Sequence, residues 1–329
     1  MKAWRVESLG EPRDALTLHD VPEPAAGPGQ VRVRVLASPA NFPDVLLCRG
    51  LYQVRPPLPF TPGVEVCGEV LDVGEGVGGF EPGQRVVGTA VLPDGGFAEQ
   101  ALLDGRATFA APDSLGDAEA SAFVIGYQTG WFALHRRAHL QRGQTLLVHA
   151  AAGGVGSAAV QLGKAAGATV VGVVGGPEKA EVARRLGADI VVDRHTEDFV
   201  SVVKKATGGR GADVVFDPVG GETYDRSTKC VAFEGRIVVV GFAGGTIQAP
   251  PLSHALVKNY AVLGLHWGLY TQVAPELVRE AHAELTRLAD AGVVAPVVSE
   301  RFGLDGVADG VQRLADGSTV GRVCWVAGA

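Results

Sequence analysis

Residues 146–157 read LLVHAAAGGVGS, an apolar strand that runs into a glycine turn and then into a helix. Gly153 and Gly154 let the backbone pass close to a pyrophosphate, and Gly156 lets the helix pack against the strand. The helix N-terminus offers free N–H groups to phosphates. Ala151 stands where the dinucleotide fingerprint has its first glycine, so the motif is imperfect. The stretch predicts a dinucleotide site, with Ala152, Gly153, Gly154 and Val155 against the phosphates.

Around this turn, apolar strands alternate with helical segments. The helical segments lie near 155–166, 177–186, 197–207, 221–230 and 254–258, and the strands near 145–149, 169–174, 190–192, 213–217, 236–240 and 261–265. Such repetition is typical of a parallel sheet covered on both faces, and six strands fit the doubly wound dinucleotide fold. A helix over 117–139, broken near Gly126, precedes the first strand.

The two ends of the chain have a different pattern. Up to about residue 115, short alternating stretches such as 31–35 are separated by proline and glycine turns, which predicts a compact barrel-like β domain. After the doubly wound region we expect a helix near 274–291 and strands near 297–300 and 321–326. These two tail strands can complete the sheet of the first domain. The fold class is therefore α/β, with a β-rich domain beside a six-stranded doubly wound domain.

The second strand of the dinucleotide unit indicates which cofactor binds. NAD-binding units place an acid there to hold the ribose 2′-hydroxyl, whereas this strand ends in Gly175 and Gly176. Lys179 opens the next helix and Arg194 follows the third strand. Small glycines leave room for a 2′-phosphate, and the two cations can neutralise it. The pattern favours NADPH over NADH.

Bulk composition excludes several function classes. Lys and Arg number 29 against 36 Asp and Glu, and the net charge of −7 disfavours nucleic acid and anionic membranes as partners. No apolar run reaches the roughly 20 residues that cross a bilayer, and no signal-peptide pattern is present, so we expect a soluble cytoplasmic protein. The four cysteines are far apart in sequence, which predicts inert, partly buried thiols.

Four segments together resemble one known family. They read SPANFPD at 38–44, PGVEVCGEV at 62–70, AAAGGVG at 150–156 and FDPVGG at 216–221. With them the chain resembles, over nearly its whole length, the quinone oxidoreductase (zeta-crystallin-like) branch of the medium-chain dehydrogenase/reductase superfamily. The resemblance implies a GroES-like catalytic domain at 1–118 and 267–329 and an NADPH-binding Rossmann domain at 119–266. It also implies a homodimer through the sixth strand, where Val262, Leu263 and Leu265 suit a two-fold contact.

The same resemblance bears on zinc. Zinc-dependent alcohol dehydrogenases of this superfamily carry Cys where Asn41 stands and His where Val64 stands. Neither Asn nor Val is a normal zinc ligand, and residues 92–105 hold no cysteine for a structural lobe. We expect no metal.

The resemblance also proposes site residues. Asn41 matches a polar residue near nicotinamide and substrate, and its amide could donate to a developing enolate or phenolate oxygen. Tyr52 matches a tyrosine that donates a proton or a hydrogen bond, with simple packing on the prolines as the alternative. Asp44 is expected to cap the following helix. Further cofactor contacts are expected from Thr129 and from the strand-end residues Val219, Gly241, Phe242, Ala243, Leu265, His266 and Trp267.

The favoured function is NADPH-dependent reduction of quinones without a metal. Such acceptors are electron-poor, so they need alignment and a hydrogen bond more than a Lewis acid. One alternative is reduction of the double bond of enones, enals or enoyl thioesters. A second is a non-catalytic NADPH-binding role, crystallin-like or RNA-binding.

Overall fold

The computed structural model describes all 329 residues, which form two compact units. Unit 1 comprises Met1–Ile125 and Thr271–Ala329, and unit 2 comprises Gly126–Tyr270. Both boundaries fall a few residues after the expected ones, inside helices α4 (Val124–Trp131) and α10 (Trp267–Val273). Unit 2 is therefore an insertion between the two segments of unit 1.

Unit 1 is built on a sheet that closes on itself. Its strand order is β13-β14-β3-β4-β5-β6, with β3 also paired to β6. Closure leaves β3 to β6 without a free edge, and the tail strands β13 and β14 extend the sheet from β3, as the sequence suggested. The strands are β3 (Gln30–Pro39), β4 (Glu65–Val73), β5 (Arg85–Ala90), β6 (Gln100–Ala110), β13 (Val298–Phe302) and β14 (Arg322–Val326).

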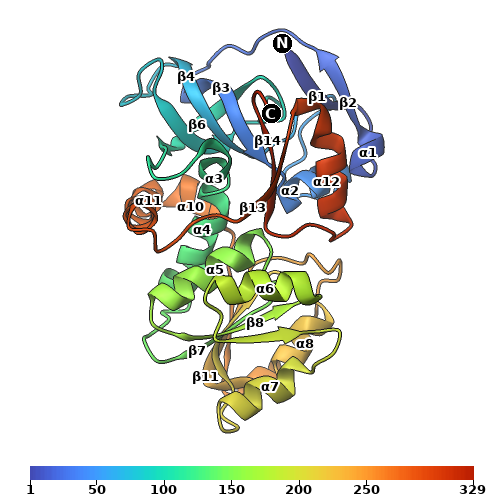
Figure 1. Ribbon diagram of the computed structural model, residues 1–329, viewed down its shortest axis with the longest axis vertical. Helices are drawn as coiled ribbons and strands as arrows, with labels where there is room; N and C mark the ends of the chain where they lie inside the picture. The colour runs from blue at the N-terminus through green and yellow to red at the C-terminus, as the bar shows by residue number, and fades with distance from the viewer. The chain divides into compact units, whose positions relative to one another are not determined.

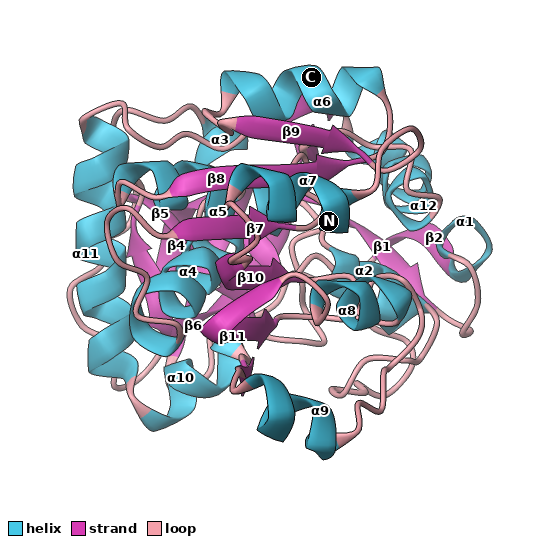
Figure 2. Cartoon of the chain, turned by 90° about the horizontal axis from the view of Figure 1, so that it is seen from below, coloured by secondary structure: helices cyan, strands magenta, loops and turns pink.

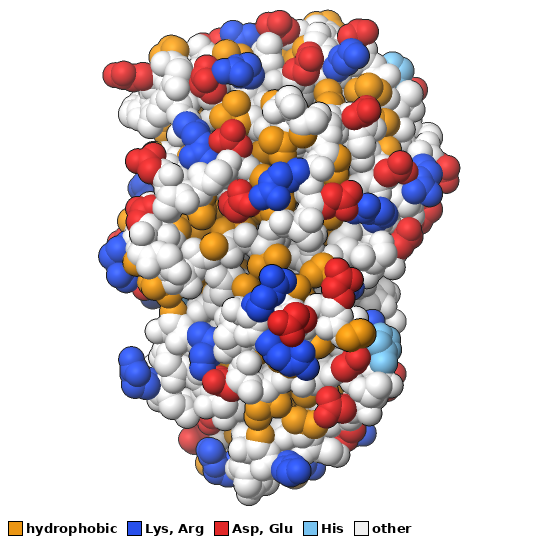
Figure 3. Space-filling model, viewed as in Figure 1, with side chains coloured by type: hydrophobic (Ala, Val, Ile, Leu, Met, Phe, Trp, Pro, Cys, Tyr) orange, Lys and Arg blue, Asp and Glu red, His pale blue; other side chains and the backbone are white.

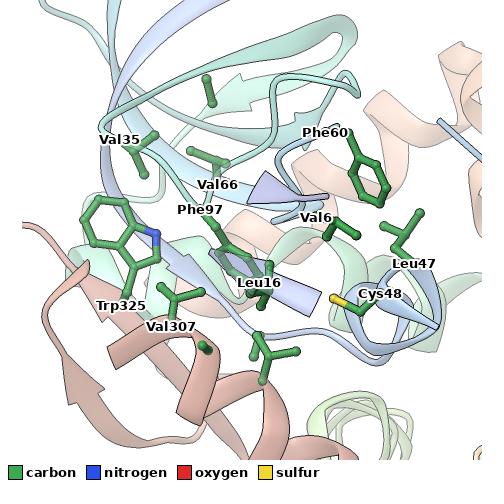
Figure 4. Packing of buried hydrophobic residues seen from close by; sticks show 14 of the residues in the cluster. Val6, Leu16, Val35, Leu47, Cys48, Phe60, Val66, Phe97, Val307 and Trp325 are labelled. Atoms are coloured by element: carbon green, nitrogen blue, oxygen red, sulfur yellow. The ribbon is translucent and has the colours of Figure 1, made fainter. Parts of the chain in front are cut away.

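Other elements cover this sheet, and Figure 1 labels most of them. Alternating residues of β3 and β4 bury one face, and Figure 4 shows Val35, Val66, Phe97 and Trp325 in the resulting core. The Trp325 indole N–H donates to the Gly96 carbonyl at 2.8 Å. The covering elements are β1 (Lys2–Val6), α1 (Pro12–Ala15), β2 (Leu16–Asp20), α2 (Phe42–Cys48), α3 (Asp117–Ser121), α11 (Pro275–Asp290), the 3-10 turn Leu304–Gly306 and α12 (Val307–Ala315).

Unit 2 is a six-stranded parallel sheet in the order β12-β11-β10-β7-β8-β9, which confirms the doubly wound fold. Figure 2 shows β9, β8, β7, β10 and β11 side by side in that order. The strands are β7 (Thr145–Val148), β8 (Thr169–Val174), β9 (Ile190–Asp193), β10 (Ala212–Asp217), β11 (Val231–Val239) and β12 (Ala261–Gly264). The helices are α5 (Gly154–Ala165), α6 (Pro177–Arg185), α7 (Phe199–Ala206), α8 (Glu222–Ser227) and α9 (Leu252–Lys258).

The helical stretch before β7 differs from the expectation in one respect. The break lies after α3, at Ala122 and Phe123, whereas Gly126 is inside α4. The physical cause is a capping contact, since the backbone N–H of Ile125 donates to the Glu65 carboxylate at 2.7 Å. That acid satisfies a first-turn donor and starts a new helix there. After α4, residues Phe132–Arg137 form a π-helix.

The outer strand β12 has an exposed apolar margin. Val262 is 43% exposed and Leu256, on the neighbouring α9, is 77% exposed. Leu265, expected on the same margin, is instead buried at 9% exposure, and Leu263 is partly buried. The Leu265 N–H donates to the Val239 carbonyl, which continues the pairing with β11. The available apolar surface is therefore Leu252, Leu256, Val257 and Val262.

The cysteines confirm one smaller expectation. Cys48, Cys67, Cys230 and Cys324 are all free and buried, and burial raises the pKa of each thiol to about 12. Such thiols are inert at neutral pH. No helix is long and apolar enough to span a bilayer.

Candidate functional site

The carboxyl ends of the parallel strands form one edge of unit 2. Because all six strands run in the same direction, the segments that follow them meet at that edge, where ligands bind in such sheets. The sequence placed most of its cofactor residues after these strands. The edge therefore brings together Ala152, Gly153, Gly154, Val155, Gly175, Gly176, Arg194, Val219, Gly241, Phe242, Ala243, Leu265, His266 and Trp267.

The glycine turn after β7 has the geometry that its sequence predicts. The Gly153 N–H donates to the Ala150 carbonyl at 2.8 Å, and Gly153 is the N-cap of α5. A Cβ on Gly156 would lie 2.0 Å from the Ala150 carbonyl oxygen, so only glycine lets the helix approach the turn. The first N–H groups of α5 have no partner within the helix. These groups and the helix dipole suit a pyrophosphate.

Cations gather where β8 ends. A Cβ on Gly175 would lie 3.0 Å from Arg194 Nε and 3.1 Å from His195 Nε2, so both side chains lie over this glycine. Burial and the nearby Arg194 both lower the pKa of Lys179, which places the two expected cations within electrostatic reach of each other. His195 is a third nitrogen donor that the sequence reasoning missed, and its position directly after Arg194 is the only sequence signal for it.

An acid also lies at this end, and the sequence reasoning missed it. Asp193 ends β9, and its Oδ1 accepts from the backbone N–H groups of Gly176 (3.0 Å) and His195 (3.1 Å). These bonds lower the pKa of Asp193 and hold one of its oxygens. Asp193 thus shapes the turn after β8 although it does not end that strand.

The segments after β10 and β11 hold each other. Asp217, the last residue of β10, accepts from the N–H groups of Val219 and Gly220, both at 2.9 Å. The Ala243 N–H donates to the Pro218 carbonyl at 3.0 Å, and the Gly244 N–H donates to the Val219 carbonyl at 2.9 Å. Val219 and Gly241–Ala243 therefore form one connected wall of the edge, from which Phe242 is 38% exposed.

After β12, the three expected residues differ in burial. Leu265 and Trp267 are buried, whereas His266 is exposed. The Trp267 indole N–H donates to Gln128 Oε1 on α4 at 2.9 Å. Thr129, the next residue on α4, is also buried. Trp267 is thus fixed by a hydrogen bond as well as by packing.

In unit 1, Asn41 begins α2 in a capping box. The Asn41 N–H donates to Asp44 Oδ2 at 2.8 Å, and Asp44 Oδ1 accepts from the N–H groups of Gly63 (2.8 Å) and Val64 (3.1 Å). The expected capping role of Asp44 is confirmed. Burial raises the pKa of Asp44 to about 7, although the three backbone donors oppose that rise.

The side chain of Asn41 joins two charged residues. Asn41 Nδ2 donates to Glu65 Oε2 at 3.1 Å and makes a longer contact of 3.4 Å with the Pro39 carbonyl, while Arg322 Nη1 donates to Asn41 Oδ1. Burial raises the pKa of Glu65, and Arg322, Ile125 and Asn41 oppose the rise. The sequence reasoning missed Glu65 and Arg322. A lone acid within the apolar strand segment 64–67 was the available signal for Glu65, whereas nothing local marks Arg322.

Tyr52 lies at the margin of the core of unit 1, half-buried and packed against it. Burial raises the pKa of the Tyr52 phenol, and the negative charge of Asp44 raises it further. The phenol therefore keeps its proton at neutral pH. No group of three or more His, Cys, Asp or Glu side chains is arranged to hold a metal ion.

Comparisons with known proteins agree with this architecture. Residues 27–134 match the family described as alcohol dehydrogenase GroES-like domain, and residues 154–283 match zinc-binding dehydrogenase. Quinone oxidoreductase-like protein 2 of Mus musculus is 34% identical over 321 residues, 97% of this chain and 91% of that protein. The structure of Escherichia coli quinone oxidoreductase complexed with NADPH has a TM-score of 0.91 at 29% identity, over 99% of this chain and 100% of that one. A mycobacterial protein complexed with NADPH has a TM-score of 0.92 at 30% identity, with the same coverage.

Proposed function

Because this chain belongs to the zinc-free quinone oxidoreductase branch of the medium-chain dehydrogenase/reductase superfamily, we propose that it reduces quinones. The chain is an oxidoreductase, and its cofactor is NADPH. Bound NADPH supplies the hydride. The proposal concerns the electron acceptor, and the geometry of the site supports a quinone.

The residues at the edge of unit 2 fit this cofactor. The turn at Gly153–Gly156 suits a pyrophosphate because the first N–H groups of α5 have no partner within the helix, and Gly156 lets that helix pack against the Ala150 carbonyl. Arg194 and His195 lie against Gly175, Gly176 is open, and Lys179 is within electrostatic reach of Arg194. These side chains suit a 2′-phosphate. Asp193, an acid at this end of the sheet, has an oxygen held by two backbone donors.

The main support for a quinone as the acceptor comes from the hydrogen bonds of the Asn41 side chain. Its carboxamide oxygen is held by Arg322 and its nitrogen by Glu65, so the side chain offers a hydrogen bond and no metal ligand. A quinone needs no more than that, because its ring already accepts hydride readily and its oxygen requires only a donor. Oxidation of an unactivated alcohol would need stronger polarisation. Asn41 is therefore our principal catalytic candidate.

A second candidate function is reduction of an α,β-unsaturated carbonyl, and Tyr52 favours it. After hydride addition, an enolate needs a proton at carbon, whereas a reduced quinone oxygen takes its proton from water. The half-buried Tyr52 phenol is protonated at neutral pH and can supply that proton, although its raised pKa makes it a weaker acid than a free tyrosine. Tyr52 would then act as general acid.

We propose that the substrate is a small molecule. Acidic and basic side chains are interspersed on the face shown in Figure 3, and the net charge of −7 disfavours nucleic acid as a partner. We further propose that the exposed apolar margin of β12 and α9 pairs with a second copy in a homodimer.

The four free cysteines suit a reducing compartment such as the cytoplasm.

The test is NADPH oxidation, followed by absorbance, across a panel of quinones, enals, enones and enoyl thioesters. We expect the highest kcat/KM with a quinone. An enone or enoyl thioester turned over about 10-fold faster than every quinone would establish the second candidate instead. NADPH binding without turnover of any acceptor would point to a non-catalytic role.

A further inference from the structure

Arg322 is a buried cation whose hydrogen bonds are incomplete. Arg322 lies at the start of β14 and is 7% exposed. Nη1 donates to Asn41 Oδ1, but Nη2 is buried and has no hydrogen-bond partner. Burying a guanidinium without a direct carboxylate partner costs free energy, and an unmade donor adds to that cost. A buried donor without a partner needs an explanation beyond packing.

Arg322 determines how the carboxamide of Asn41 is oriented. Oδ1 faces the cation and Nδ2 faces the Glu65 carboxylate. A flipped amide would place its NH₂ against the guanidinium and its oxygen against the carboxylate, and both contacts would be repulsive. The orientation is therefore fixed by charge on both sides.

One N–H of this amide has only a weak partner. The first donates to Glu65 at 3.1 Å, while the second makes the long contact of 3.4 Å with the Pro39 carbonyl. An acceptor oxygen can replace such a weak partner. Because Oδ1 is bonded to a cation, the amide is polarised and its remaining N–H is a stronger donor.

We propose that Arg322 is a positioning residue of the reductase, acting through Asn41 on the oxygen of the acceptor. The inference rests on the proposed function. At its other end the same chain of bonds reaches Glu65, which caps the first turn of α4 through Ile125. The arginine thus orients a donor and stabilises the acid that supports it, without touching the substrate.

The test is a double-mutant cycle with Arg322→Met and Asn41→Ala, measured with the best acceptor of the panel. We expect Arg322→Met alone to lower kcat at least about 30-fold with the Kd for NADPH unchanged. In the Asn41→Ala background, Arg322→Met should cost less than about 3-fold, because its effect passes through the missing amide. Arg322→Lys keeps the charge and should recover most of the rate.

The matched control is Arg313→Met on α12, which removes an arginine that is ion-paired with Glu300 and lies outside the chain of bonds. It should leave kcat within about 2-fold. Full additivity of the two losses, or an equal loss in the control, would overturn the role of Arg322. If Arg322→Met does not fold, Arg322→Gln, which also removes the charge, supplies the same comparison in both backgrounds. If the unsubstituted chain reduces no acceptor, the proposed function fails first and the positioning role falls with it.

Discussion

The cofactor edge of unit 2 and the Asn41 cluster of unit 1, which consists of Asn41, Glu65 and Arg322, are built by opposite means. The edge consists of backbone turns, and its critical contact joins Gly156 to Ala150, six positions away. The cluster consists of side chains, and its contact between Arg322 and Asn41 spans 281 positions. One site offers peptide N–H groups beside open glycines, and the other buries two opposite charges on either side of an amide.

This difference determines what each region can tolerate. Every residue except proline has a backbone N–H group, so the phosphate turn of the edge fails mainly when added atoms displace the chain. The cluster keeps its shape with many side chains, but its electrostatics fail when one charge is removed, because the partner is left buried and unpaired. Substitutions that add atoms should therefore have the larger effect at the phosphate turn of the edge. Substitutions that remove a charge or a polar atom should have the larger effect at the cluster.

The largest effect is expected from Gly156→Ala. The new Cβ would meet the Ala150 carbonyl oxygen at 2.0 Å, so the turn or the helix must move away from the phosphate position. We expect the Kd for NADPH, measured by fluorescence titration, to rise at least about 100-fold. Gly78→Ala is the control, because a Cβ there has nothing within 4 Å. Unchanged affinity in the Gly156 variant would show that the edge is not limited by sterics.

Tyr52→Phe tests whether unit 1 contributes a proton as well as a hydrogen bond. We expect a loss of at least about 100-fold in kcat on the best enoyl substrate, with quinone reduction nearly intact, if Tyr52 is a general acid. The phenol keeps its proton because burial and Asp44 raise its pKa. If neither activity changes by more than about 3-fold, Tyr52 only packs against the core.

The same contrast explains what the sequence could predict. The strand, turn and helix at residues 145–165 are local, so periodicity and glycine spacing were sufficient for the doubly wound fold and for the phosphate turn. The tail strands were also recognisable by their apolar pattern. The placement of Asp193 beside Gly176 was not, because it depends on the register between β8 and β9.

The cluster of unit 1 lay further beyond sequence reasoning. Asn41 was found only through resemblance, and its expected partner was a substrate oxygen alone. Its actual contacts with Glu65 and Arg322 arise from strand pairing, since β3 pairs with both β4 and β14. The helix break after α3 has the same origin, because a carboxylate from β4 caps α4. Contacts across a closed sheet have no local signature.

A smaller effect is expected from the cations at the adenosine end. NADPH should bind at least about 10-fold tighter than NADH, a difference of about 1.4 kcal/mol. Lys179→Ala and Arg194→Ala should each reduce that preference, because Arg194 lies against Gly175 and Lys179 is within electrostatic reach of Arg194. Lys205→Ala, on α7, removes an exposed lysine elsewhere in unit 2 and serves as the control. Equal affinity of the unsubstituted chain for both cofactors would contradict the assignment.

The assembly state tests a third surface, which belongs to neither region. Light scattering should give twice the chain mass of 34.0 kDa if β12 and α9 pair with a second copy. Val262→Glu should shift the mass towards the monomer, because it places a charge in the exposed apolar margin. Leu9→Glu, on an exposed loop of unit 1, should leave the mass unchanged. A monomer mass for the unsubstituted chain at micromolar concentration would exclude this interface.

The smallest expected effect is that of chelation, and it tests the cluster directly. Residues 154–283 match a family whose description mentions zinc, yet the resemblance in unit 1 aligns Asn41 and Val64, neither of them a normal zinc ligand, with the Cys and His of zinc-dependent members. Asn41 has both polar atoms engaged by Glu65 and Arg322, and a cation beside Arg322 would be repelled by the guanidinium. Exhaustive dialysis against EDTA should therefore leave kcat and KM unchanged. Stoichiometric zinc by elemental analysis, with activity lost on its removal, would replace the amide-and-arginine account with a metal-centred one.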